Sequence, residues 1–110
     1  MSGESEEKKI YSFLGLCMRA GGLTSGETSV VSAIRSGKTA LVLVAKDASD
    51  NTRKLYGDKC ASHGTEIRFF GTADALGGAI GKNKRTAVAI TDDNFAREIK
   101  KKLALLNKEL

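Results

Sequence analysis

The stretch TSGETSVVSAIRSGKTALVLVAKDAS, residues 24–49, predicts a helix that leads directly into a buried strand. Gly26 opens an amphipathic run whose inward-facing residues recur every three or four positions, and Gly37 closes this run. The unbroken apolar segment 40–45 that follows is rich in valine, as expected of a strand covered on both faces. Lys46 comes directly after it, so the sequence predicts a basic side chain where this strand ends.

The rest of the chain continues the alternation of helices and strands. The expected helices span residues 6–20, 26–36, 51–62, 73–80 and 92 or 93 to the C-terminus; the expected strands span 40–45, 66–70 and 86–90, with a short extended link at 23–25. This alternation predicts an α/β fold, a single three-layer αβα sandwich with a small mixed four-stranded sheet. The polar residues 1–7 are expected to be a flexible N-terminus, and residues 8–110 to form one domain.

The composition favours a polyanionic partner and a reducing compartment. The 110-residue chain has a formal net charge of +5 and a pI near 9.4, which points first to nucleic acid and second to an anionic membrane. Cys17 and Cys60 are far apart and lack metal-ligand spacing, so both are expected to be buried, reduced thiols. No apolar run is long enough to span a bilayer, and the N-terminus has no signal-peptide core. We therefore expect a cytoplasmic protein.

The residues that could carry catalysis have simpler interpretations, and the sequence predicts no enzyme, cofactor or metal site. Nucleophilic catalysis usually needs a nearby histidine base, and the chain has one histidine, His63. His63 lies at an expected helix end, where a cation suits the helix dipole. Asp92 and Asp93 are adjacent at an expected helix start, which is typical of capping residues.

The glycine-rich segment LGGAIGKNKR, residues 76–85, does not match a phosphate-binding P-loop. That motif needs a glycine five positions before its Gly-Lys pair, and Ser or Thr after the lysine. This chain has Leu76 and Asn83 at those positions. We therefore expect Gly77, Gly78 and Gly81 to serve close packing and a turn.

Three segments are expected to converge at one edge of the sheet, where helix N-termini gather. They are the start of the helix at 26–36, the exit of the strand at 40–45, and the basic loop before the strand at 86–90. Free N–H groups and the helix dipole suit the first segment to an anion, and Gly26 has no Cβ to keep a polynucleotide backbone away. The predicted RNA-binding residues are Gly26, Glu27, Thr28, Ser29, Ser32, Lys38, Lys46, Lys82, Lys84, Arg85 and Thr86.

Four short segments occur here in a characteristic order and spacing. They are FLGLCMRAGGLTSGE (13–27), AIRSGKTALVLVAKDAS (33–49), TRKLYGDKCASHG (52–64) and LGGAIGKNKRTAVAI (76–90). Together they resemble the kink-turn-binding ribosomal proteins of the L-seven-Ae and L-thirty-e type, in particular the bacterial YlxQ-type subgroup, over about residues 8–100. The resemblance implies an αβα sandwich that binds RNA without catalysis, at a sharply bent helix with tandem sheared G·A pairs. It implies a ribosomal or other structured RNA as partner; a monomer is the default expectation.

The contact motif of that family, Gly-x-Asn-Glu-x-x-Lys, falls on residues 26–32, and only its glycine is present. Thr28 replaces the asparagine, Ser29 the glutamate and Ser32 the lysine. Hydroxyl groups can make hydrogen bonds in place of the family's side chains, but they carry no charge, so the resemblance implies an altered contact with RNA. The family's second contact, the loop before the last strand, falls on residues 85–87 and is flanked here by lysines, which favours phosphate contact.

Two other functions fit parts of the sequence. The altered contact motif would suit a protein–protein adaptor, which would dock through Leu103, Leu105 and Leu106 beside a run of lysines on the last helix. A nucleotide-binding enzyme is a third hypothesis, because a related fold is the RNA-binding appendage of some RNA ribose methyltransferases. Those enzymes carry a separate cofactor-binding domain, for which 110 residues leave no room.

Overall fold

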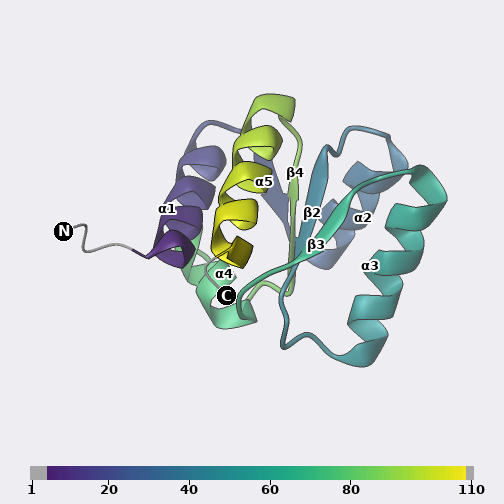
Figure 1. Ribbon diagram of the computed structural model, residues 1–110. Helices are drawn as coiled ribbons and strands as arrows, with labels where there is room; N and C mark the ends of the chain where they lie inside the picture. The colour runs from purple at the N-terminus through teal and green to yellow at the C-terminus, as the bar shows by residue number, and fades with distance from the viewer. Residues whose placement is uncertain (1–4, 109–110) are drawn as a thin grey trace.

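The computed structural model describes residues 5–108, in which five helices surround a four-stranded sheet (Figure 1). The elements are α1 (Glu6–Arg19), β1 (Leu23–Ser25), α2 (Glu27–Arg35), β2 (Leu41–Val44), α3 (Asp50–His63), β3 (Ile67–Phe69), α4 (Ala73–Ala79), β4 (Ala87–Ile90) and α5 (Asp93–Lys108). The predicted α/β fold class and element order are confirmed, and element ends agree to within one residue wherever both lie in the described range.

The sheet is mixed and has the strand order β1-β4-β2-β3. The last strand in the chain, β4, lies in the interior and is antiparallel to both β1 and β2, whereas β2 and β3 are parallel. Strands β1, β2 and β3 therefore all end at the edge of the sheet where β4 begins. We call this the lower edge, because it faces the bottom of Figure 1, where α4 lies.

Two separate cores cover the two faces of the sheet. Leu41 and Leu43 of β2 point into a core built with α1, α4 and α5, whereas Val42 and Val44 point into a core built with α2 and α3. Figure 1 shows the corresponding layers, with α1, α4 and α5 on one side of the sheet and α2 and α3 on the other. Because successive strand residues alternate between the faces, the unbroken apolar run of β2 is buried throughout.

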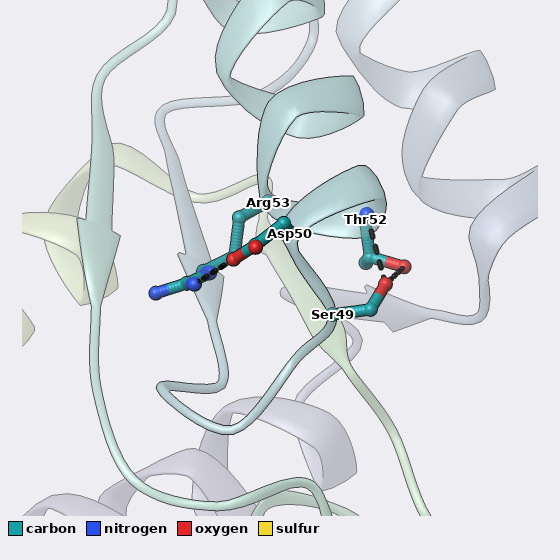
Figure 2. A network of polar contacts seen from close by, with 4 residues as sticks. All are labelled: Ser49, Asp50, Thr52 and Arg53. Atoms are coloured by element: carbon teal, nitrogen blue, oxygen red, sulfur yellow. Dashed lines mark hydrogen bonds and ion pairs between the residues drawn. The ribbon is translucent and has the colours of Figure 1, made fainter.

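Polar side chains cap the N-termini of α1, α3, α4 and α5. Asp47 and Ser49 are both capping residues by type, and the sequence places both before α3. Ser49 does cap α3, since its Oγ accepts from the Thr52 N–H at 3.1 Å, next to an Asp50–Arg53 ion pair (Figure 2). Asp47 Oδ1 instead accepts from the Ala73 N–H of α4 at 2.9 Å. The parallel pairing of β2 and β3 makes this contact possible, because it brings the ends of both strands to the lower edge.

Two further caps are made by Asp92, as expected, and by Ser5, which the sequence did not predict as a cap. Asp92 Oδ1 accepts from the N–H groups of Asn94 and Phe95 at 2.8 and 3.0 Å, and so caps α5. Ser5 caps α1, so the last residues of the expected flexible segment 1–7 form the start of this helix, while residues 1–4 lie outside the described residues. Within residues 5–108, no helix has the length and apolar composition that a bilayer-spanning segment requires.

Gly77 on α4 holds the loop before β4 in place. A Cβ at Gly77 would lie 1.9 Å from the Asn83 carbonyl oxygen, so only glycine allows the loop to pack this closely. Gly81, with φ of 74°, makes the turn out of the helix. The expectation of close packing is wrong for Gly78, because a Cβ there would meet nothing within 4 Å.

Gly77→Ala is therefore expected to lower the free energy of unfolding by about 1–3 kcal/mol, because the loop backbone has to move. Gly78→Ala is the matched control, one residue along the same helix. It should leave stability unchanged or raise it by up to about 1 kcal/mol, through better helix propensity. Urea denaturation measures both changes, and equal effects of the two substitutions would contradict this account of the loop.

The two cysteines are free and buried, as expected, and lie in different cores on opposite faces of the sheet. Burial raises the pKa of Cys17 to about 11, with a smaller contribution from the negative charge of Asp92. Burial also raises the pKa of Cys60. Neither thiol is therefore activated for nucleophilic chemistry.

These raised pKa values predict a loss of stability at alkaline pH. The folded protein keeps thiol protons that the unfolded chain releases above its pKa of about 9. The contribution of Cys17 is complete below pH 9 and is lost as pH rises towards 11. Urea denaturation at pH 8 and at about pH 10.5 should show this loss, and Cys17→Ala should reduce the difference between the two pH values. An identical pH dependence in Cys17→Ala would refute the assignment.

Candidate nucleic-acid interface

Strand register brings the three predicted segments together at the lower edge. Ser25, the last residue of β1, is paired with Val88 of β4, and the Ala45 N–H donates to the Thr86 carbonyl at 2.8 Å. Gly26 comes directly after Ser25, Lys46 comes directly after Ala45, and Thr86 is itself one of the bonded residues. The predicted convergence is therefore confirmed as geometry, whereas a role of these residues in RNA binding stays a prediction.

The N-terminus of α2 is open. Gly26 is the N-cap residue, with φ of 91° and ψ of 145°, a backbone conformation that essentially only glycine adopts. It supplies no side chain to cap the helix, and space is open around it, because a Cβ would meet nothing within 4 Å. The first N–H groups of α2 are thus available to an external acceptor, and the helix dipole favours an anion there.

Hydroxyl groups line the exposed side of α2. Thr28, Ser29 and Ser32 are all exposed and occupy one sector of the helix, opposite the buried Val30 and Ile34. Glu27 lines a groove towards α3 together with Thr28 and Ser32, and its negative charge adds to burial in raising the pKa of Tyr56. Side chains two positions apart on a helix point to different sides, so Glu27 is not placed to replace the acidic residue of the family motif, which falls on Ser29.

Arg85 joins the basic loop to the end of β1. Its Nε donates to the Ser25 Oγ at 3.2 Å, and its Nη1 donates to the carbonyl oxygens of Lys84 and Asn83 at 2.9 and 3.4 Å. Its backbone N–H donates to the Ala73 carbonyl at 3.0 Å. The guanidinium group thus positions the loop beside Gly26, a role that the sequence did not indicate. Ser25 was missed, and its place directly before Gly26 is the signal that could have identified it.

Lys46, Lys82 and Lys84 supply exposed positive charge at the lower edge. In the part of the chain that the structure describes, none of the three takes part in an ion pair. Lys46 lies beside two acidic residues, since Glu7 and Asp47 line the same surface depression. The positive charges of Lys82 and Lys84 are therefore less neutralised by nearby carboxylates than the charge of Lys46.

Lys38 is the one predicted residue that the structure places elsewhere. It follows α2 and lines a depression with Thr91 and Asp93, at the edge of the sheet where β4 ends. It therefore lies at the upper edge, at the far end of α2 from Gly26. Its position in the sequence already indicated this, because Lys38 follows the predicted helix 26–36 and precedes the predicted strand 40–45, and so lies at the opposite end of both from Gly26 and Lys46.

The rest of the described chain offers no alternative centre for metal chemistry. Within residues 5–108, no group of three or more His, Cys, Asp or Glu side chains is placed to hold a metal ion. His63 ends α3, where its Nδ1 lies 3.1 Å from the Lys59 carbonyl. This position agrees with the expected helix end.

The contact between Arg85 and Ser25 can be measured by a double-mutant cycle on stability. A part-buried hydrogen bond of this kind should give a coupling of about 1 kcal/mol between Arg85→Ala and Ser25→Ala in urea denaturation. Lys84→Ala with Ser25→Ala is the control pair, because the Lys84 side chain is exposed and has no hydrogen bond to Ser25. Coupling near zero in the first cycle would show that Arg85 does not hold the loop.

Comparison with known proteins identifies relatives of this architecture. The chain is 39% identical over 89 residues to "RNA-binding protein YlxQ" of Bacillus subtilis (strain 168), which covers 81% of this chain and 89% of that protein. It is 37% identical over 98 residues to "RNA-binding protein YlxQ" of Enterococcus faecium, covering 88% and 93%.

Two solved structures have the same fold as this chain. A Bacillus halodurans protein described as having unknown function superposes with a TM-score of 0.82 at 36% identity, covering 87% of this chain and 97% of that one. The Giardia lamblia 15.5kD RNA binding protein shares the fold, with a TM-score of 0.74 at 18% identity, covering 100% and 94%. The sequence model of the ribosomal protein L7Ae/L30e/S12e/Gadd45 family matches residues 8–100, and the chain therefore belongs to this family.

Proposed function

We propose that the protein binds structured RNA through the lower edge, with a preference for a sharply bent, kink-turn-like helix. The observation that carries this proposal is the uncapped N-terminus of α2, open at Gly26 and adjacent to the basic loop before β4. Family membership agrees with a binding protein rather than an enzyme. The names of the two curated relatives support RNA as the ligand.

Each part of the lower edge has a separate task in this proposal. The N–H groups of the first turn of α2 bind phosphate, and the absence of a side chain at Gly26 allows the RNA backbone to approach closely. Thr28, Ser29 and Ser32 offer hydroxyl groups to bases and riboses. Lys82 and Lys84 contact the flanking phosphates, which position the RNA but carry no sequence information. Recognition then depends on the shape of the RNA and on its unpaired bases.

The cellular setting is part of the same proposal. The family description supports a ribosomal or ribosome-associated RNA as the partner. Two buried, free thiols suit a reducing cytoplasm. The adaptor alternative has little surface to use on α5, because Leu103 is buried and Leu106 packs against the same core, while Leu105 is exposed. We therefore favour RNA over a protein partner.

A gel-shift titration against a kink-turn RNA and a duplex of matched length, each at two salt concentrations, tests the proposal. The kink-turn should bind at least about tenfold more tightly, which corresponds to one good base contact of about 1.4 kcal/mol. Lys82→Gln combined with Lys84→Gln should weaken binding to both RNAs and reduce the salt dependence. The Lys38→Gln variant is the control and should bind as the native protein does.

The substitutions in the contact motif can be tested in the same assay. Replacing Thr28, Ser29 and Ser32 by the family residues, through Thr28→Asn, Ser29→Glu and Ser32→Lys, should raise kink-turn affinity and leave duplex affinity nearly unchanged. Equal, salt-sensitive binding of the native protein to both RNAs would reject the kink-turn preference. Absence of binding to either RNA would reject the proposed function.

A further inference from the structure

A groove of about 460 Å³ runs between α2 and α3, on the side of the molecule away from α1 and α5. Its lining residues come from both helices: Glu27, Thr28, Val31, Ser32 and Arg35 from α2, and Leu55 and Lys59 from α3. Neither Arg35 nor Lys59 belongs to the lower edge, and neither was selected from the sequence.

The groove is continuous with the lower edge. Thr28 and Ser32 belong both to the exposed hydroxyl sector of α2 and to the groove lining. Arg35 follows on the same side of the helix, since positions i, i+4 and i+7 lie on one face. At 1.5 Å per residue, Arg35 lies about 14 Å along the helix from Gly26. A ligand that begins at the open N-terminus of α2 can therefore extend along this face to Arg35.

The charge of the groove favours an anion at its far end. In the described part of the chain, Arg35 and Lys59 take part in no ion pair, whereas their neighbours on α3 do: Arg53 pairs with Asp50, and Lys54 with Asp58. Glu27 is the one carboxylate in the groove lining, and it lies at the opposite end of α2 from Arg35. Two cations without carboxylate partners thus face each other across the groove.

The floor of the groove is apolar and has no group that a ligand must hydrogen-bond. Val31 and Leu55 are partly buried and apolar, and they separate the charged ends of Arg35 and Lys59 from the core below. The stems of both cationic side chains can cover this apolar surface while their charged groups reach into solvent. Such a surface suits a ribose-phosphate backbone, which needs cations for its phosphates and no specific partner for its sugar carbons.

We propose that one arm of the bound RNA continues from the lower edge along the α2–α3 groove, where Arg35 and Lys59 hold its phosphates. This inference rests on the proposed function. It moves the positive charge that the family motif would place at Ser32 to Arg35, nearly one turn further along α2. It also adds a contact from α3.

The test compares two variants of the full chain that lose the same charge. Arg35→Gln with Lys59→Gln removes the groove cations. Arg97→Gln with Lys38→Gln removes an arginine and a lysine from outside the proposed interface. The dependence of log affinity on log salt concentration is measured for a kink-turn RNA, and again after shortening each of its two arms in turn.

The groove variant should reduce the salt slope by about two, one for each phosphate that the protein no longer neutralises, while the control variant keeps the native slope. Shortening one arm should weaken native binding, and the groove substitutions should then have no further effect on that RNA. If the native protein binds the RNA and the groove variant keeps the native salt slope, this inference is overturned and the proposed function remains intact. An equal weakening of binding in the two variants would also overturn it, as a general charge effect. If the native protein binds none of these RNAs, both proposals fail.

Discussion

The pairing of β4 with β1 on one side and β2 on the other is the constraint on which the proposed interface depends. Because β4 is antiparallel to both neighbours, its first residue lies where they end. This single arrangement places the loop before β4 between Gly26 and Lys46, which are far apart in the sequence. A parallel β4 would move that loop to the upper edge, beside Lys38 and away from the N-terminus of α2.

The loop before β4 is held from two directions. Gly77 lets its backbone lie directly against α4, and Arg85 fastens it to Ser25 at the end of β1. Arg85 therefore has most of its side-chain contacts within the protein, and the neighbouring lysines are the groups left exposed to a ligand. Because the loop backbone is already held in place, less entropy is lost in ordering this segment when a polyanion binds.

The sequence predicted the fold well because each element has a local signal. The apolar run of β2 and the glycine at the end of α3 define their elements without reference to the rest of the chain. Contacts between segments distant in sequence were not predictable in this way. Asp47 has the residue type of an α3 cap, but it bonds to α4 because β2 and β3 end together. The edge to which Lys38 belongs, by contrast, was predictable, because this residue precedes the strand that Lys46 follows.

The proposed anion-binding surface depends on cations that have no carboxylate partner. The described ion pairs lie within α1, α3 and α5, or join Glu66, directly before β3, to Arg68 of β3 and Lys100 of α5. Lys82, Lys84, Arg35 and Lys59 have no such partners in the described range, so four cations without ion pairs lie near the uncapped end of α2 and along its outer face, while other unpaired cations, such as Arg19 on α1 and Arg97 on α5, lie elsewhere. Exposed charges separated by more than about 8–10 Å are screened at physiological salt, so their placement determines which ligand they attract. With hydroxyl groups in place of the charged motif residues, these cations supply the electrostatic attraction, and the shape of the RNA determines which RNA is selected.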